Sequence, residues 1–311
     1  MRKNNHLINP LPIRNGVSAS RVWLPKGNWK LILDFLIEKF PNITPEIMQA
    51  RMQRGEIMDS KGNCYDVDSP YRSGIHLFYY RELDNETEIP FQATVFYRDE
   101  HILVADKPHF LPVVPAGRFL HQTLLVRLKK EFQLDQLTPI HRIDRETAGV
   151  VMFCINPQSR GHYQSLFQQR KIQKNYQAIA GYNKTMQQQS LPLIYRSKMV
   201  KGKPFFRMQE VKGEPNSETI IDIIETQGKY ALYDLKPVSG RQHQLRVHLA
   251  SLGCPILHDP FYPELQPCKG DDFSKPLQLL AKSIAFIDPI SDQKRYFESQ
   301  RKLDWKSLDQ R

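Results

Sequence analysis

The sequence predicts an α+β fold with a mostly antiparallel sheet flanked by helices, preceded by a small N-terminal α/β module. Short apolar runs typical of strands mix with amphipathic stretches typical of helices, without the regular βαβ rhythm that indicates a parallel sheet. The composition also changes near residue 88. A chain of 311 residues is long enough for one large domain and a small one.

The elements of the small module are predicted from apolar periodicity and from the proline, glycine and capping residues between the periodic segments. Residues 1–27 lack periodicity and contain three prolines, so we expect an N-terminal tail. Apolar spacing predicts a helix over 28–40, and a Thr-Pro start with a Gly stop predicts a second over 44–55. Lys61-Gly62 then indicates a hairpin. The module therefore spans 28–88.

The larger domain is predicted to span 89–311. Its expected strands cover 94–97, 101–105, 150–155, 175–182, 219–226, 230–237 and 242–247, and its expected helices cover 121–132, 159–172 and 249–252. The continuous apolar run at 150–155 is typical of a strand that is buried on both faces.

The charge of the chain is unevenly distributed. Lys and Arg number 44 against 33 Asp and Glu, a net charge of +11. Residues 1–90 hold 12 basic and 11 acidic side chains, so ten of the excess charges lie in 91–311. A basic surface attracts polyanions, which favours a nucleic-acid partner. A basic protein that binds nothing acidic is the alternative.

The apolar stretches and the cysteines of the sequence indicate its cellular compartment and whether it binds a metal. No stretch reaches the ~18 unbroken apolar residues of a membrane span, and the basic start lacks the apolar core of a signal peptide. We therefore expect a cytoplasmic protein with no membrane association. The four cysteines, at 64, 154, 254 and 268, form no C-x-x-C pair, so we expect free thiols and no metal site.

One stretch concentrates charge directly before an apolar run. In "PIHRIDRETAGVV", residues 139–151, Asp144 lies between Arg142 and Arg145. A carboxylate beside cations is stabilised in its charged form, which suits a nucleophile or an electrostatic stabiliser. The alternative is a salt-bridged turn that leads into a strand. A protein kinase is excluded because Ile143 interrupts the H-R-D triplet and Gly149 stands where an Asn is required.

A second stretch, "SGRQHQLRVHLASLGCPILHDPFYP", covers 239–263. As a strand it would place Arg241 and His243 on one face, and Gln244 and Arg246 on the other. A half-buried arginine needs an anion, and the candidates are Asp144 within the chain or an RNA phosphate outside it. An exposed edge strand is the alternative.

A third stretch, "QRKIQKNYQAIAGY", places Arg170, Lys171 and Lys174 just before Tyr176. A lone tyrosine is by default a core residue with its hydroxyl at the surface. After a basic run it could instead stack on a base or move a proton. These alternatives remain open from the residues alone.

Together these stretches resemble the RluA-type pseudouridine synthases. The family segments H-R-[LI]-D-x-x-T-[SA]-G, K-x-Y, G-R-x-H-Q-[IL]-R-V-H, G-x-P-I and D-x-x-Y are matched, in order, over roughly 91–290. The matched positions are His141 to Asp144, Thr147 to Gly149, Lys174, Tyr176, Gly240 to His248, Gly253, Pro255, Ile256, Asp259 and Tyr262. The family's entry strand with its closing K-P is matched by "YRDEHILVADKP".

The departures from the family pattern are small. Ala148 stands where many members have Ser, Gln242 where they have Thr or Ser, His258 where they have Gly, and the late L-H-A segment reads "LLA" at 279–281. None touches Asp144, so we expect effects on substrate choice or rate. The module at 28–88 weakly resembles the ribosomal-protein-S-four-type RNA-binding domain, although its balanced charge does not fit a strong RNA binder.

The resemblance implies the pseudouridine synthase fold and the isomerisation of uridine in rRNA or tRNA, without a cofactor or a metal. It implies a catalytic carboxylate at Asp144, which attacks the anomeric carbon or removes the neighbouring sugar proton. Arg241 is expected to pair with that carboxylate, so Arg241→Lys is expected to lose much of the rate. Tyr176 is expected to lie against the uracil.

Further implications concern the RNA partner. The expected RNA-binding residues are His141, Arg142, Lys174, His243 and Arg246, around a stem-loop whose target base is flipped out. We expect a monomer with no obligate protein partner. One alternative is a catalytically inactive RNA-binding or ribosome-assembly factor on the same fold. Another is a glycosidase that uses Asp144 and Glu146 as its two carboxylates.

Overall fold

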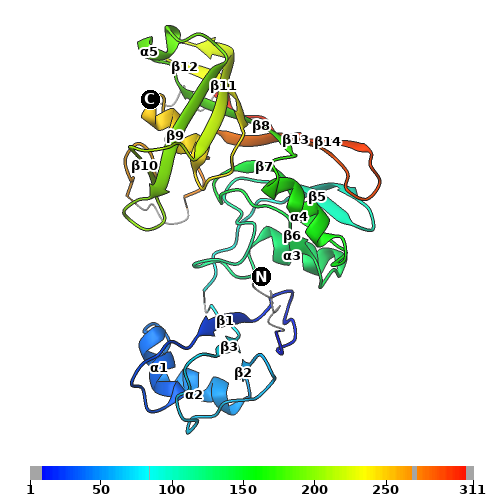
Figure 1. The fold of residues 1–311 in the computed structure, drawn as a ribbon, viewed down its shortest axis with the longest axis vertical. Helices are drawn as coiled ribbons and strands as arrows, with labels where there is room; N and C mark the ends of the chain where they lie inside the picture. Colours follow the sequence, from blue (N-terminus) through cyan, green and yellow to red (C-terminus); the bar gives the residue numbers. More distant parts are fainter. Residues whose placement is uncertain (1–8, 84, 268–271, 306–311) are drawn as a thin grey trace. The chain divides into compact units, whose positions relative to one another are not determined.

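The structure is a computed structural model that describes residues 9–83, 85–267 and 272–305. The chain divides into two compact units (Figure 1). The smaller unit contains the chain up to Glu86 together with Gly117–His121, and the larger contains 87–116 and the chain from Gln122 onward. The predicted free thiol at Cys268 lies outside the described residues.

The small unit packs two helices against a three-stranded antiparallel sheet of order β1-β3-β2. Its elements are β1 (Ser20–Trp23), α1 (Ile32–Lys39), α2 (Pro45–Gln53), β2 (Ile57–Asp59) and β3 (His76–Tyr79). Helix α2 begins as the sequence predicts, because Thr44 Oγ1 accepts a hydrogen bond from the N–H of Ile47 and proline occupies the first helical position.

Two details of this unit differ from the predictions. Strand β1 lies in the segment predicted to be a tail and pairs with β3, so the tail prediction is wrong for these residues; residues 1–8 lie outside the described part. The predicted hairpin is present but short: Gly62 donates its N–H to Asp59 O in a tight turn, and the return segment joins β2 through the N–H of Asp59 to Asn63 O and the N–H of Tyr65 to Ile57 O. The return segment forms a single bridge, of Cys64 with Met58, rather than a strand, and β2 pairs with β3 along its length.

The large unit is built on one eleven-stranded sheet whose main path runs β10-β9-β11-β12-β8-β13-β7-β5-β4. Its strands are β4 (Thr94–Arg98), β5 (Ile102–Lys107), β6 (Thr138–Pro139), β7 (Ala148–Cys154), β8 (Gln173–Gly181), β9 (Leu193–Lys201), β10 (Met208–Val211), β11 (Ser217–Gln227), β12 (Tyr230–Pro237), β13 (Leu279–Ile287) and β14 (Lys294–Glu298). The pairs are antiparallel except β13 with β7, which confirms the predicted mostly antiparallel mixed sheet.

Helices lie beside this sheet (Figure 1). They are α3 (Leu124–Phe132), α4 (Arg160–Gln168), α5 (Lys184–Gln187) and α6 (Gln244–Ser251). Tyr163 and Leu166 of α4 pack in one core cluster with Ile102 of β5 and Val150 of β7. Every residue of β7 is buried, as the continuous apolar run predicts for a central strand. None of the helices in the described part of the chain is long and apolar enough to cross a bilayer.

The parallel contact between β7 and β13 explains the glycine of the T-A-G segment. Gly149 lies opposite Ala281 and has φ +114°, a conformation that side chains rarely adopt. A Cβ atom at this position would lie 2.2 Å from the carbonyl oxygen of Ala281. Only glycine lets the two backbones approach this closely, directly after the loop that carries Asp144.

The largest error in the predicted elements is at 242–247, where the structure has helix α6 instead of a strand. His243 has φ 55°, and the helix begins at the next residue. All side chains from Gln244 to Leu249 are buried, polar ones included. A helix buried all round has no polar stripe, so its alternating polar and apolar residues also fit the period of a strand.

Candidate active site

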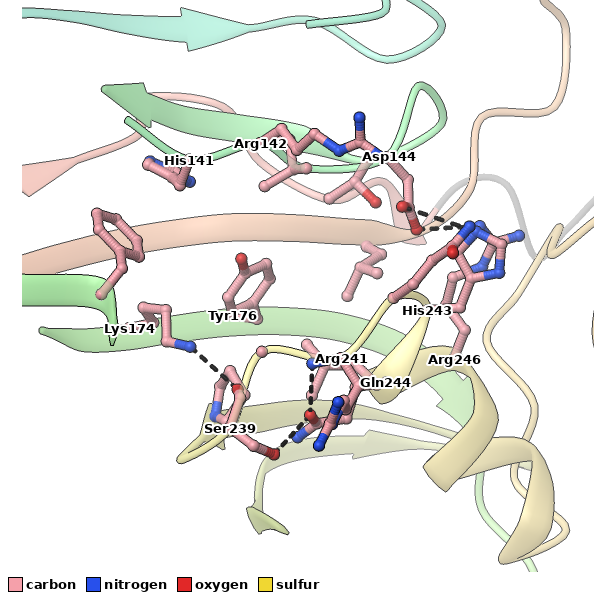
Figure 2. A pocket seen from close by; sticks show the side chains of 18 residues that line it. His141, Arg142, Asp144, Lys174, Tyr176, Ser239, Arg241, His243, Gln244 and Arg246 are labelled. Carbon is pink, nitrogen blue, oxygen red and sulfur yellow. Dashed lines mark hydrogen bonds and ion pairs between the residues drawn. The ribbon is translucent and has the colours of Figure 1, made fainter. Parts of the chain in front are cut away.

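A pocket of about 420 Å³ opens in the large unit (Figure 2). The segment before β7, strand β8, the loop after β12 and the start of α6 form its wall. All eight predicted site residues line it: His141, Arg142, Asp144, Lys174, Tyr176, Arg241, His243 and Arg246. The structure thus brings three stretches that are distant in the sequence into one site.

Asp144 lies in a tight turn immediately before the buried strand β7. Its backbone oxygen accepts a hydrogen bond from the N–H of Thr147 at 3.2 Å, and Thr147 is buried. The carboxylate remains 25% exposed, so a ligand in the pocket can reach it. The turn therefore fixes the carboxylate of Asp144 in the wall of the pocket, where it remains accessible.

The guanidinium that pairs with Asp144 belongs to Arg246. Its Nη1 lies 3.2 Å from Asp144 Oδ2, while Nε and Nη2 donate to Asp259 at 2.8 and 2.6 Å. Burial lowers the pKa of Arg246, but the hydrogen bonds and charge of Asp259, with the charge of Asp144, outweigh it and raise the pKa above its usual value. Arg246 is therefore a permanent cation, fixed by one carboxylate and aimed at another.

The predicted pair between Asp144 and Arg241 is wrong. Arg241 is exposed, and its Nε donates to the backbone oxygen of Asn216 at 3.2 Å. The prediction failed because it treated 242–247 as a strand, whereas the helix turns Arg246 toward the acid. Arg246 was expected to bind RNA, but its side chain is only 1% exposed and is held by two carboxylates, so it is not available to a phosphate on the surface.

His243 is the second neighbour of Asp144. Its Nε2 lies 3.7 Å from Asp144 Oδ1, and its Nδ1 lies 2.9 Å from the hydroxyl of Tyr262. That hydroxyl accepts the N–H of Met208, so its proton is free for His243 Nδ1. These bonds assign the proton of the neutral ring to Nε2, facing Asp144. Burial lowers the pKa of His243, which keeps the ring neutral.

Tyr176 lies in the middle of the pocket, between the Asp144 turn and the loop that carries Arg241 (Figure 2). Burial raises the pKa of its hydroxyl, and the charge of Asp144 adds to the effect. The phenol is therefore neutral and acts as a hydrogen-bond donor with an aromatic face. Lys174, two residues before it on β8, donates to Ser239 O at 3.1 Å, and burial lowers its pKa to about 8.

His141 and Arg142 differ sharply in their surroundings. His141 Nε2 accepts the backbone N–H of Met152 at 3.1 Å, and its ring stacks on Phe167 with centroids 4.7 Å apart. Burial lowers the pKa of His141 to about 3, so the ring adds no positive charge to the site. Arg142 is exposed to solvent.

Sequence reasoning missed three residues that shape the site: Gln244, Asp259 and Lys107. Gln244 Oε1 accepts from the Ser239 hydroxyl and from the Arg241 N–H, at 2.7 and 3.1 Å, which fixes the loop after β12 (Figure 2). Gln244 and Asp259 both lie in matched motifs, but their bonds to Ser239, Arg241 and Arg246 depend on helix α6, which the sequence analysis predicted as a strand.

Lys107, in the K-P of the entry strand, binds the backbone of the turn that carries Asp144. Its fully buried Nζ lies within hydrogen-bond distance of three backbone oxygens, of Pro108, Leu111 and Arg145, at 2.9, 2.7 and 3.1 Å. Burial lowers its pKa to about 7. Through Arg145, Lys107 ties the residue after Asp144 to the end of β5.

Helix α6 is anchored by a buried histidine, which makes stability depend on pH. His248 Nε2 lies 3.1 and 3.0 Å from the hydroxyls of Ser197 and Ser217, and Nδ1 lies 2.9 Å from that of Thr219. Burial lowers the pKa of His248 to about 4. An unfolded histidine titrates at about 6.5, so between these values the unfolded chain binds a proton that the folded chain does not.

The free energy of unfolding should therefore fall as the pH falls through this window, with a contribution from His248 of about 2 kcal/mol between pH 7 and pH 5. Urea unfolding at the two pH values measures it. His248→Gln should be less stable at pH 7 and show a smaller fall to pH 5. An equal fall in both proteins would mean that the pKa of His248 is the same in the folded and the unfolded chain.

Comparison with known proteins shows which family the chain resembles. Residues 101–251 match the family model described as RNA pseudouridylate synthase. The chain is 32% identical to the dual-specificity RNA pseudouridine synthase RluA of Pasteurella multocida, over 66% of this chain and 90% of the relative. It is 29% identical to an uncharacterized RNA pseudouridine synthase of Synechocystis, over 74% of this chain and 79% of the relative.

A solved structure supports the fold. Human RNA pseudouridylate synthase domain containing 1 superposes with a TM-score of 0.55 over 70% of this chain and 94% of that one, at 21% sequence identity. The motif order, the mixed sheet and the identity to relatives covered almost end to end lead to one family. The chain belongs to the RluA-type RNA pseudouridine synthases, which are isomerases.

Proposed function

We propose that Asp144 is the carboxylate that catalyses this isomerisation, on a uridine flipped out of a structured rRNA or tRNA stem-loop. One observation carries the proposal: a single partly exposed acid stands in the pocket and is held by a buried guanidinium that cannot lose its charge. The pairing places a fixed positive charge beside the acid and restricts its direction, as a nucleophile or base requires.

The chemistry needs only the groups already in the pocket. Asp144 either attacks the anomeric carbon or removes the adjacent sugar proton, and in both cases the bond from the sugar to N1 breaks and its electron pair goes to the uracil. The uracil turns and carbon 5 bonds to the anomeric carbon; in the first route the bond from Asp144 to that carbon breaks, and in the second Asp144 returns the proton to the sugar. The proton on carbon 5 then passes to solvent, and N1 takes up a proton from solvent. Composition is unchanged overall, so neither an oxidant nor a group donor is required.

The side chains around Asp144 have separate proposed roles. Tyr176 supplies an aromatic face for the uracil ring, and its neutral phenol keeps a hydroxyl proton to offer a bound ligand. His243 directs its Nε2 proton toward the second oxygen of Asp144. Arg241, which is exposed at the rim, is reassigned from orienting the acid to contacting RNA, together with Arg142 and Lys174.

The rest of the proposal concerns the substrate and the setting. The Pasteurella relative is named a dual-specificity RNA enzyme, which supports RNA as the substrate, and we propose an rRNA or tRNA stem-loop. The small module is proposed to add a minor RNA contact, since its charge is nearly balanced. We also propose that the protein acts as a monomer, without an obligate protein partner, in the cytoplasm.

Tritium release tests the proposed activity. Transcripts of rRNA and tRNA labelled with tritium at carbon 5 of uridine should lose label to water only when carbon 5 forms the new bond. The chain should release tritium without added metal or cofactor, and pseudouridine mapping of cellular RNA with and without the gene should identify the position. RNA binding without release would favour the inactive RNA-binding factor.

A further inference from the structure

A second pocket of about 290 Å³ adjoins the first. Five residues line both: Phe167, Lys174, Ser239, Gly240 and Arg241. A polymer that places one residue in the first pocket therefore passes directly into the second. Nothing in the proposed chemistry uses this space, because Asp144, Tyr176 and Arg246 line only the first pocket.

The charges around the second pocket are of one sign. Arg170, Lys174 and Arg241 line it, and none of the described residues in its lining is acidic. Burial lowers the pKa of Lys174, and the charge of Arg170 lowers it further, so the two cations lie near each other without a carboxylate between them. Close like charges are unfavourable unless an anion joins them, and phosphate is the anion that RNA provides.

The backbone at Arg170 is held in an uncommon conformation. Helix α4 ends just before it, and Arg170 has φ 58°, in the left-handed region that usually favours glycine or asparagine. Its N–H donates to Phe167 O, and the N–H of Lys171 donates to Leu166 O. The turn directs an exposed arginine to the wall of the second pocket, whereas Lys171 lines neither pocket.

Phe167 supplies the apolar part of the same site. Its ring stacks on His141 with an interplanar angle of 23°, which holds it at the boundary between the two pockets. Ile172 and Val238 add apolar surface beside it. A ring beside a cluster of cations is the combination that single-stranded nucleic acid binds, through a base and a phosphate.

We propose that the second pocket binds the RNA nucleotide next to the target uridine, with its phosphate at Arg170 and Lys174 and its base against Phe167. This inference rests on the proposed role of the first pocket as the uridine site. It adds a specificity element, because the neighbouring base must also leave its helical stack. Targets in loops or bulges meet that requirement more easily than targets within a duplex.

The test compares Arg170→Asn with Arg170→Lys and with Lys171→Asn. Asparagine tolerates the left-handed conformation, Arg170→Lys keeps the charge, and Lys171→Asn removes the same charge one residue away. Filter binding of the labelled rRNA and tRNA transcripts at several salt concentrations gives the number of phosphate contacts. Arg170→Asn should reduce the slope of log K against log salt by about 0.7 to 0.9, and the other two variants should not.

Turnover provides a second readout. Arg170→Asn should raise KM for the transcripts about tenfold and leave kcat nearly unchanged, because a phosphate contact is equally strong in the ground and transition states. In a stem-loop built around the mapped uridine, an uncharged methylphosphonate at one of the two flanking positions should raise KM for the wild type but not for Arg170→Asn.

The possible outcomes separate this inference from the proposed function. If the wild type releases no tritium, the role of Asp144 fails, while the salt slopes still report on Arg170. If Arg170→Asn and Lys171→Asn give equal slopes, the second pocket is not a phosphate site, whatever the activity. A fall in kcat with unchanged KM would also overturn the inference, because Arg170 would then act on the chemical step.

Discussion

Asp144→Asn should abolish pseudouridine formation while folding and RNA binding stay nearly intact. The amide keeps the size of the carboxylate but can neither attack the sugar nor act as a base. Removing a reacting group lowers the rate by at least about a thousandfold in well-studied enzymes. Tritium release measures the loss, and filter binding and thermal unfolding check that the protein is otherwise normal.

Glu146→Gln is the matched control for this variant. Glu146 is two residues away and pairs with Arg145 at 3.1 Å, but it does not line the pocket. The rate of tritium release by Glu146→Gln should differ from that of the wild type by less than about threefold, as expected for a substitution outside the reacting groups. Comparable losses in the two variants would instead favour a mechanism with two carboxylates, and turnover by Asp144→Asn would remove Asp144 from the catalytic role.

Arg246→Lys should impair both the rate and the stability. A lysine cannot donate to Asp259 through two nitrogens and also reach Asp144. Asp259 has no exposed side-chain surface, so weakening its partner leaves a buried charge poorly compensated, at a cost of about 3 kcal/mol. We expect a rate loss of about a hundredfold, because Asp144 loses its fixed direction.

Arg241→Lys is the matched control for this variant. It keeps the charge of an exposed side chain and should lose much less activity than Arg246→Lys. Rates come from tritium release, and stabilities come from urea unfolding of the same preparations. Asp259→Asn adds a second line of evidence, since it should lower stability without removing the acid in the pocket. A larger rate loss in Arg241→Lys than in Arg246→Lys would restore the pairing predicted from the sequence.

Much of the fold is predictable because local signals agree with tertiary burial. The Thr44 cap begins the helix it predicts, and the apolar run at 150–155 falls in strand β7 except for its last residue. Helix α6 is not predictable in this way, because its polar side chains are buried against partners far along the chain. The choice between Arg241 and Arg246 depended on that helix, so an error in periodicity became an error in the site.

The residues that line the pocket were predictable, because the motif set names them without any knowledge of geometry. All eight line one pocket, but the motifs do not specify which of them pair, and the pairing predicted for Asp144 named the wrong arginine. The same limit applies to the second pocket. The sequence identifies Arg170 as one of a run of cations, but only the turn after α4 shows that Arg170 lines the pocket and Lys171 does not.

Asp144 and Arg246 are separated by 102 positions in the chain, and this separation bears on how the protein reaches its native state. Contacts between distant positions carry a large loop-closure entropy and tend to form late. We therefore expect the acid and its guanidinium to come together late, once the intervening strands have joined the sheet. Nascent chains on the ribosome, and partly folded chains in general, would then lack the assembled acid–guanidinium pair, and the proposed uridine chemistry would begin only with the finished molecule.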